Sequence, residues 1–412
     1  MNGVRRVEVL VVGAGPAGLA AAARLAASGA GRVEVLDRDQ RAGGAPRSCA
    51  HGGFGTWLHP LTGPAYARLL IRAAVRAGAV VRTGVAALDW AGPLTLTTAG
   101  PGGPETVEAG AVVLATGARE RPRAARLVPG TRPAGVYTTG ELQQAVHLYG
   151  QRVGTRAVVV GAEDVSYAAA DTVRASGADV VAMVTELPRA ATSPARALDA
   201  RLRHRIPLLT GGTVAELLGH GRLSGVRVRH RDGRTAVLPC DTVVFTGDFV
   251  PDHELARTGT LLPDPGTGGP AVDGGLRTSR PGVFAVGSVL HPAESAATAA
   301  REGAHAAGAV RAWLADGRWP DSVPLVAEGP LRWIAPHRVA PGDRHGGYVL
   351  RGALPPTRPV LLVTQDGRLL HRARPALLPN ARHRAWAPDL TLSAHWTHRV
   401  DPGGGPVRVT AG

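Results

Sequence analysis

A glycine-rich turn between a strand and a helix constrains the fold of this 412-residue chain more than any other feature. Residues 7–12 are rich in valine, as expected of a strand buried in a parallel sheet, and they run into Gly-Ala-Gly-Pro-Ala-Gly at 13–18. An alanine-rich helix follows, and residues 32–36 predict a second strand with Asp37 at its end. This order predicts a βαβ unit that binds a dinucleotide.

Each glycine of this turn has its own physical role. Gly13 makes the tight turn, Gly15 lets the backbone approach a pyrophosphate, and Gly18 lets the helix press on the strand. The positive end of the helix dipole attracts the pyrophosphate. Asp37 lies nineteen residues after Gly18, where it can accept hydrogen bonds from the adenosine ribose. The same geometry serves NAD, so this turn alone does not choose between FAD and NAD.

The same order of elements appears twice along the chain. In each copy a strand, a glycine turn, a helix, a strand, a meander and an apolar strand ending in Thr-Gly follow one another. For the first copy we also predict a helix over 61–78 and strands over 80–82, 85–90, 94–98, 105–107 and 111–115. For the second we predict helices over 138–149, with Thr138 and Glu141 as a capping box, and 164–176, and strands over 156–160, 179–184, 213–218, 223–229, 235–238 and 242–245. The duplication predicts an α/β fold with two Rossmann-like dinucleotide-binding domains.

The remainder of the chain completes this organisation. A strand over 283–286 and a helix over about 293–314 follow a Gly- and Pro-rich stretch. Beyond Trp319, dense prolines and short alternating runs such as 360–364 and 368–371 predict a small β-rich domain. The predicted domains are a cofactor-binding domain in two parts, 1–121 and 251–318, an inserted NAD(P)-binding-like domain, 122–250, and the C-terminal β domain, 319–412.

Charge and cysteine usage exclude several classes of function. The net charge is +15, but the sequence has no lysine and its arginines are scattered, so we expect no nucleic-acid partner. Without lysine the chain can form no Schiff base and no GxxxxGK[ST] phosphate loop. The two cysteines, Cys49 and Cys240, are far apart, which excludes a redox CxxC and a cysteine-ligated iron–sulfur cluster. We expect no metal site; His395 and His398 have metal-like spacing but no third ligand.

The first thirty residues resemble a secretory signal, but glycines and Pro16 break the apolar run, and the strand–turn–helix interpretation explains it better. No other stretch is apolar enough to cross a bilayer. We therefore expect a soluble, cytoplasmic protein without a membrane partner.

Two later segments resemble a known family. Residues 111–117, Ala-Val-Val-Leu-Ala-Thr-Gly, and 278–287, Thr-Ser-Arg-Pro-Gly-Val-Phe-Ala-Val-Gly, resemble the second and third FAD signatures of the flavoproteins with two dinucleotide-binding domains, the pyridine nucleotide-disulphide oxidoreductase type. The resemblance implies FAD, with Gly287 beside the ribityl chain and the next helix pointing its positive end at the flavin. Ser288 stands where the family has an aspartate. The predicted cofactor-binding residues are Gly13, Gly15, Pro16, Ala17, Gly18, Asp37, Arg38, Gly44, Val85, Ala115, Thr116, Gly117, Gly287, Ser288 and Ala296.

Four motifs narrow the resemblance over roughly residues 5–315. Segments 43–55, 61–67, 117–123 and 291–295 look like those of the flavoprotein subunits of opine oxidase and hydrogen cyanide synthase and the α subunits of sarcosine oxidase and dye-linked proline dehydrogenase. Members oxidise C–N bonds of amino acids and secondary amines, or pass electrons to an acceptor from a partner subunit. Many carry a C-terminal cysteine cluster for [2Fe–2S], which this chain lacks because no cysteine follows Cys240.

Candidate catalytic residues are few. His51 and His291 are the predicted proton carriers beside the flavin, with purely structural roles as the alternative. Glu294 is a candidate to steer an amine; the alternative is an acid favoured by the helix dipole. In the second glycine turn Glu163 stands where a glycine should admit a pyrophosphate, which makes NAD(P) binding doubtful, although Glu186 could accept from a ribose.

The leading functional hypothesis is FAD-dependent oxidation of an amine or amino-acid-like small molecule by hydride transfer to the flavin. A partner oxidase subunit or a separate acceptor would take the electrons. Two alternatives stay open: an NAD(P)H-dependent flavoprotein reductase that uses the second domain, and a flavin-binding electron-relay subunit without its own substrate site.

Overall fold

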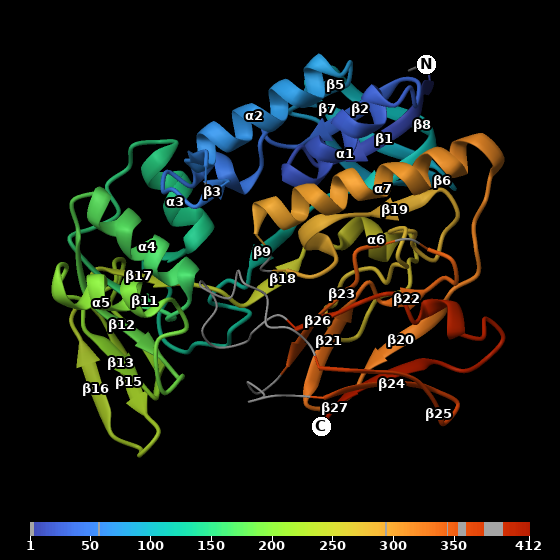
Figure 1. The fold of residues 1–412 in the computed structure, drawn as a ribbon. Coiled ribbons are helices and arrows are strands. Elements are labelled where there is room, and N and C mark those ends of the chain that lie inside the picture. Colours follow the sequence, from blue (N-terminus) through green and yellow to red (C-terminus); the bar gives the residue numbers. More distant parts are fainter. Residues whose placement is uncertain (1–3, 57, 293–294, 344, 353–359, 375–389) are drawn as a thin grey trace. The chain divides into compact units, whose positions relative to one another are not determined.

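The computed structural model describes residues 4–56, 58–292, 295–343, 345–352, 360–374 and 390–412 (Figure 1). The chain divides into two compact units, each with its own hydrophobic core. Unit 1 contains the described residues up to Ala118 and those from Val250 onward, and unit 2 contains Arg119–Phe249. The domain boundaries proposed above stay predictions.

Unit 1 is built on a mixed sheet with the strand order β5-β2-β1-β8-β7-β6, with β19 also paired to β8. The strands are β1 (Val4–Val12), β2 (Val33–Asp37), β5 (Val80–Thr83), β6 (Ala86–Gly92), β7 (Thr95–Gly100), β8 (Gly103–Leu114) and β19 (Val283–Ala285). Strands β5, β2, β1, β8 and β19 run parallel, whereas β7 and β6 form the antiparallel meander. The helices are α1 (Pro16–Ala27), α2 (Gly63–Arg76), α6 (Glu254–Thr258) and α7 (Ala296–Asp316), and the shorter elements are η1 (Ala45–Ser48), β3 (Phe54–Gly55), β4 (Pro60–Leu61) and η2 (Gly287–Val289).

One strand prediction is wrong. Residues 105–107 and 111–114 of the two predicted strands belong to the single strand β8, which continues through Gly110 and ends at Leu114. The physical reason is pairing: β1 runs parallel to β8 from Thr106 to Leu114 and holds the intervening residues in extended conformation.

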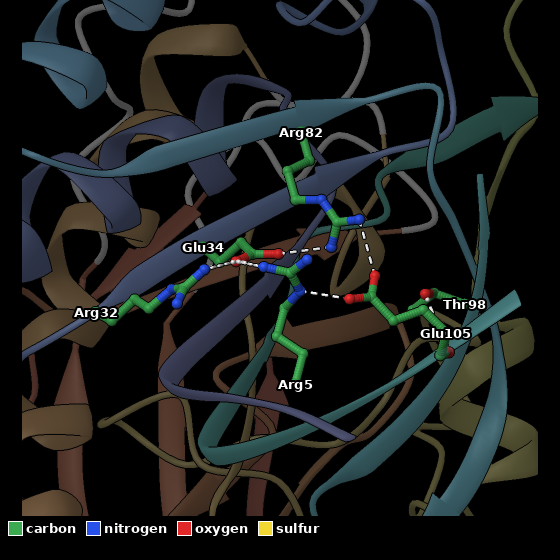
Figure 2. A network of polar contacts seen from close by, with 6 residues as sticks. All are labelled: Arg5, Arg32, Glu34, Arg82, Thr98 and Glu105. Carbon is green, nitrogen blue, oxygen red and sulfur yellow. Dashed lines mark hydrogen bonds and ion pairs between the residues drawn. The ribbon is translucent and has the colours of Figure 1, made fainter. Parts of the chain in front are cut away.

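A cross-strand polar network lies in this sheet (Figure 2). Glu34 of β2 has a fully buried side chain and contacts Arg82 of β5 at 2.8 Å. Glu105 of β8 contacts Arg5 of β1 and, at 2.8 Å, the same Arg82. Two carboxylates thus alternate with guanidinium groups across four strands, which compensates charges that the sheet buries.

The C-terminal part of unit 1 is β-rich, as predicted. One sheet has the order β22-β20-β27-β24-β25 and another the order β21-β23-β26, and their side chains share a core. The strands are β20 (Val323–Ala327), β21 (Leu331–Ala335), β22 (Arg338–Val339), β23 (Tyr348–Gly352), β24 (Leu361–Gln365), β25 (Arg368–Ala373), β26 (Leu390–Leu392) and β27 (Val407–Ala411), with η4 (Thr397–Arg399).

Unit 2 repeats the dinucleotide-binding architecture. Its parallel sheet has the order β10-β17-β11-β12-β13, beside an antiparallel sheet of β14, β15 and β16. The elements are β10 (Val136–Thr138), α3 (Thr139–His147), β11 (Arg156–Val160), α4 (Asp164–Ala175), β12 (Asp179–Thr185), α5 (Pro194–Leu202), β13 (Leu208–Thr210), β14 (Gly212–Leu218), β15 (Gly225–His230), β16 (Thr235–Leu238) and β17 (Thr242–Phe245); β9 (Ala118–Glu120) and β18 (Phe249–Pro251) lie at the ends of the unit. The capping box of Thr138 and Glu141 is present, whereas α5 and β13 were not predicted. Across the described residues, no helix is long and apolar enough to span a membrane.

Candidate functional site

The first glycine turn of unit 1 closes tightly on the sheet at two positions. Gly13 has φ +109°, and a Cβ atom added there would lie 2.3 Å from the carbonyl oxygen of Ala115. A Cβ added at Gly18 would lie 1.9 Å from the carbonyl oxygen of Gly13. Only glycine fits either position, so α1 begins directly against the ends of β1 and β8.

Gly15 has open space instead. The nearest atom to a Cβ added there is the Gly44 Cα, 4.0 Å away. Gly15 is the N-cap of α1, and in the described part of the chain no side chain caps this helix and no acid lies in its first turn. The N–H groups and positive dipole end of α1 therefore face an open cradle. The cradle fits an anionic group such as the pyrophosphate of FAD.

Asp37 lies at the edge of this cradle. Its Oδ2 atom accepts from the backbone N–H of Ala14 at 2.8 Å, and its Oδ1 atom accepts from Asp39 at 2.9 Å. Burial raises the pKa of the Asp37 carboxyl, against the hydrogen bonds from Asp39 and Ala14, which lower it. Val85 is also brought here, since its N–H donates to the Asp37 carbonyl oxygen at 2.9 Å. Each carboxylate oxygen retains a lone pair for a ribose hydroxyl.

A second glycine pair lies on the turn. The Gly43 N–H donates to the Ala14 carbonyl oxygen at 2.8 Å. Gly44 has φ +61°, and a Cβ added there would lie 2.8 Å from the Gly15 Cα. Gly44 is among the predicted cofactor-binding residues, whereas Gly43, which contacts Ala14 from a distant part of the chain, is not.

Asp252 contacts Thr116 and Gly117, the predicted residues that follow β8, and was not itself predicted from the sequence. The Thr116 hydroxyl donates to its carbonyl oxygen at 2.6 Å, and its N–H donates to the Gly117 carbonyl oxygen at 2.8 Å. Arg38, which is exposed, contacts the Asp252 carboxylate at 3.2 Å. The Ala115 N–H donates to Val12 at the end of β1.

The turn at Gly287, which lies far along the chain, packs against Ala17 at the start of α1. Gly287 has φ +76°, and a Cβ added there would lie 2.6 Å from the Ala17 Cβ. In α7, a Cβ added at Gly303 would lie 1.9 Å from the Ala17 carbonyl oxygen, so α7 crosses α1 in close contact (Figure 1). Ser288 and Ala296, both half-buried, lie beside this crossing, within η2 and at the start of α7.

His291 is buried next to this turn, with 2% of its surface exposed. Its Nε2 atom lies 2.7 Å from Glu302 Oε1, and the other oxygen of Glu302 accepts from the Gly287 N–H at 3.1 Å. The imidazole stacks on Trp333, with ring centroids 5.6 Å apart. Sequence reasoning missed Glu302; the available signal was an acid on the otherwise small, apolar face of α7.

His51 lies on the loop before β3 and is half-buried. Its Nδ1 atom is 2.7 Å from the Gly52 carbonyl oxygen, and its ring packs on Phe54, which packs on Tyr66. Because a carbonyl only accepts, Nδ1 is the donor in this contact, and in the neutral imidazole Nε2 is the nitrogen with a free lone pair. His51 contacts Gly52 and Phe54, whereas His291 contacts Glu302 and Trp333. No described contact therefore joins the two predicted proton carriers. Glu294 lies outside the described residues, and within them no three His, Cys, Asp or Glu side chains are grouped to hold a metal.

Comparison with known proteins agrees with this geometry. Residues 7–303 match the sequence profile of the family described as pyridine nucleotide-disulphide oxidoreductase. The alpha subunit of sarcosine oxidase from Corynebacterium sp. (strain P-1) is 31% identical over 284 residues, which cover 62% of this chain and 28% of that protein. An opine oxidase subunit from Agrobacterium tumefaciens (strain Ach5) is 35% identical over 235 residues, covering 54% and 44%. The chain thus spans less than half the length of either relative.

Solved structures share the fold. Thioredoxin reductase of T. acidophilum superposes with a TM-score of 0.64 at 23% identity, covering 75% of this chain and 98% of that one. The NAD-dependent persulfide reductase of A. fulgidus gives 0.58 at 19% identity, covering 87% and 68%. The predicted fold and family resemblance are confirmed. The chain belongs to the pyridine nucleotide-disulphide oxidoreductase family, a family of FAD-binding oxidoreductases.

Proposed function

We propose that this chain uses FAD to oxidise a C–N bond of an amine or amino-acid-like small molecule. The relatives named for sarcosine and opines support this substrate class, because both compounds are secondary amines that carry a carboxylate. Bound FAD would supply the hydride acceptor.

The observation that carries the proposal is the open space at the Gly15 turn in a chain that has no redox dithiol. The sequence has only two cysteines, Cys49 in unit 1 and Cys240 in unit 2, and no CxxC. Cys240 is buried, and burial raises the pKa of its thiol to about 11, so it stays an unreactive thiol. This chain therefore has no adjacent cysteine pair to accept electrons from the reduced flavin, and the flavin must pass its electrons to another acceptor.

Different residues of unit 1 bind the cofactor, accept a proton and position the Gly287 turn. The Gly15 backbone and the α1 N-terminus bind the pyrophosphate, and Asp37 binds the ribose. His51, with its basic Nε2, accepts a proton from the substrate amine. His291 and Glu302 hold a proton at the Gly287 turn and position that turn. A partner oxidase subunit or a separate acceptor removes the electrons, and the sparse cysteine usage supports a reducing, cytoplasmic compartment.

The test is anaerobic mixing of the purified yellow protein with sarcosine, an opine, NADH or NADPH while the visible flavin absorbance is followed. Bleaching by an amine, lost in His51→Asn at unchanged FAD content, is the expected result. Saturable bleaching within seconds by NADH or NADPH alone would instead establish the reductase. Glu186 is exposed after β12, where it could accept a hydrogen bond from a nucleotide ribose, and this position favours the reductase alternative. If none of these donors bleaches the flavin, the function that remains is an electron-relay subunit without its own substrate site.

A further inference from the structure

We infer that unit 2 fills its own pyridine-nucleotide position with the Glu163 carboxylate, so that the second dinucleotide-type fold binds neither NADH nor NADPH. The inference concerns unit 2 alone. It therefore stands or falls independently of the amine-oxidation proposal.

The two glycine turns of the molecule differ at the position that meets the pyrophosphate. In unit 1 this position is Gly15, with open space in front of it. In unit 2 it is Glu163, the N-cap of α4. A Cβ added at Gly161, whose φ is +135°, would lie 3.0 Å from Glu163 Oε2. The carboxylate therefore folds back over the turn and places a negative charge at the positive end of α4.

Buried hydroxyl groups hold this carboxylate in place. Ser166, which is fully buried, lies with its Oγ 3.1 Å from Glu163 Oε2 and accepts from the Glu163 N–H at 3.1 Å. The same Oγ is 2.6 Å from the Thr246 hydroxyl at the end of β17. The reciprocal bonds between residues 163 and 166 form a capping box. The Glu163 carboxylate therefore lies at the helix N-terminus, where the pyrophosphate of a nucleotide would otherwise bind.

A second carboxylate and an arginine occupy the neighbouring strand end. Glu120, 8% exposed, accepts from the Gly140 N–H at the start of α3 and from the Gly247 N–H, both at 3.0 Å. Arg126 donates to the Gly247 carbonyl oxygen at 2.7 Å. Burial lowers the pKa of Arg126, against the attraction of Asp248, Glu120 and Glu163, which raises it. The carboxyl end of β17, which a dinucleotide would have to cross, thus already carries the Glu120 carboxylate and the Arg126 guanidinium group.

The segment after β12 also lies on the first turn of α4. The Ala191 N–H donates to the Ala162 carbonyl oxygen at 2.8 Å, and the Thr192 hydroxyl bonds the Asp164 carboxylate. Ala191 and Thr192 are 5% and 2% exposed. A dinucleotide would have to displace this segment and bring two negative phosphate charges against Glu163 and Asp164. Glu186 alone does not offset these costs, because a ribose contact leaves the pyrophosphate without a site.

Direct binding tests this inference without any turnover. NADH and NADPH are titrated into the purified protein and followed by nicotinamide fluorescence and by calorimetry. Glu163→Gln removes the charge and keeps the bulk, whereas Glu163→Gly removes both. Glu216→Gln, on β14, is the control for loss of one negative charge elsewhere in unit 2. Circular dichroism verifies that each variant is folded.

The parent and Glu216→Gln are expected to show no saturable binding of either nucleotide up to millimolar concentration. Glu163→Gln should bring measurable binding, and Glu163→Gly at least a tenfold gain over the parent. Saturable micromolar binding by the parent would overturn the inference. So would folded Glu163→Gln and Glu163→Gly proteins that bind no better than Glu216→Gln.

Discussion

Gly15 and Gly18 belong to one turn, yet a side chain added at each would meet different surroundings. At Gly18 the new Cβ would strike the backbone of Gly13. At Gly15, whose φ of −79° and ψ of −175° suit any residue, it would meet no protein atom closer than 4.0 Å. The fold does not require a glycine at this position, and we expect a ligand to take the space in front of it.

Gly15→Val is accordingly expected to fold like the parent and to lose FAD. The valine methyl groups would occupy the space of the pyrophosphate, and affinity should fall at least tenfold, about 1.4 kcal/mol. The measurement compares FAD content after purification with the melting temperature of the apoprotein. Gly308→Ala in α7, where an added Cβ meets nothing within 4 Å, is the control and should keep its flavin. A folded Gly15→Val protein with full flavin content would refute the assignment.

Asp37 combines a structural and a proposed ligand role, which two substitutions separate. Asp37→Asn keeps an acceptor oxygen for Ala14 or Asp39, whereas Asp37→Ala loses both backbone contacts. Loss of charge-assisted hydrogen bonds to a ribose should cost about 1.5–3 kcal/mol, or about ten- to a hundredfold in FAD affinity, in both variants. Only Asp37→Ala should also show a clearly lower melting temperature. Unchanged FAD affinity in Asp37→Asn would mean that the ribose binds elsewhere.

At the scale of elements, the ion network of Figure 2 ties β1, β2, β5 and β8 together. Glu34→Gln would remove the buried carboxylate of the network and leave Arg82 with only the partly exposed Glu105 as its counter-charge. The loss of a buried charged hydrogen-bond partner should cost about 1–3 kcal/mol. The control is Glu108→Gln, whose partner Arg6 is 81% exposed, and which should cost at most about 1 kcal/mol. Denaturant unfolding of both variants measures the difference. Equal losses would show that the network does not stabilise the sheet.

Acid should weaken the same network through Glu105. Burial raises the pKa of Glu105, but hydrogen bonds from Arg5 and Arg82 outweigh it and hold the pKa below its ordinary value. The resulting stabilisation is present above the pKa of the unfolded carboxyl and is lost as the pH falls through the lower folded value. The free energy of unfolding should therefore decline in the acid range, and Glu105→Gln should flatten that decline. A variant with the same acid slope as the parent would assign the effect to other carboxyls.

At the scale of the whole molecule, the two units have separate cores, and the glycine turn of unit 1 has open space at Gly15. We therefore propose that FAD binds unit 1 alone. We expect two thermal transitions, of which added FAD raises only one. At a hundredfold excess over its Kd, FAD would stabilise unit 1 by about 2.7 kcal/mol. Scanning calorimetry with and without FAD measures this, and Gly15→Val should abolish the shift. Equal shifts of both transitions would contradict the assignment of FAD to unit 1 alone.

Features that depend on a few neighbouring residues could be predicted from the sequence. The 13–18 turn and the capping box of Thr138 and Glu141 appear as predicted, and Glu163 lies on the second glycine turn as its N-cap residue. Each follows from local backbone geometry, because a tight turn or a helix start restricts which side chains fit within one turn of chain. The α/β duplication could also be predicted, because each strand, turn and helix of the repeated order is recognised from its own residues.

Contacts between residues that are far apart in the sequence could not be predicted in the same way. The contact of Gly287 with Ala17, the pairing of Glu302 with His291 and the bond from Thr116 to Asp252 join residues from separate elements. Continuity of β8 through Gly110 likewise depends on β1, which lies about a hundred residues earlier in the chain. Such contacts leave no local pattern, because their geometry is fixed by how helices pack on a sheet and not by the residues adjacent in sequence.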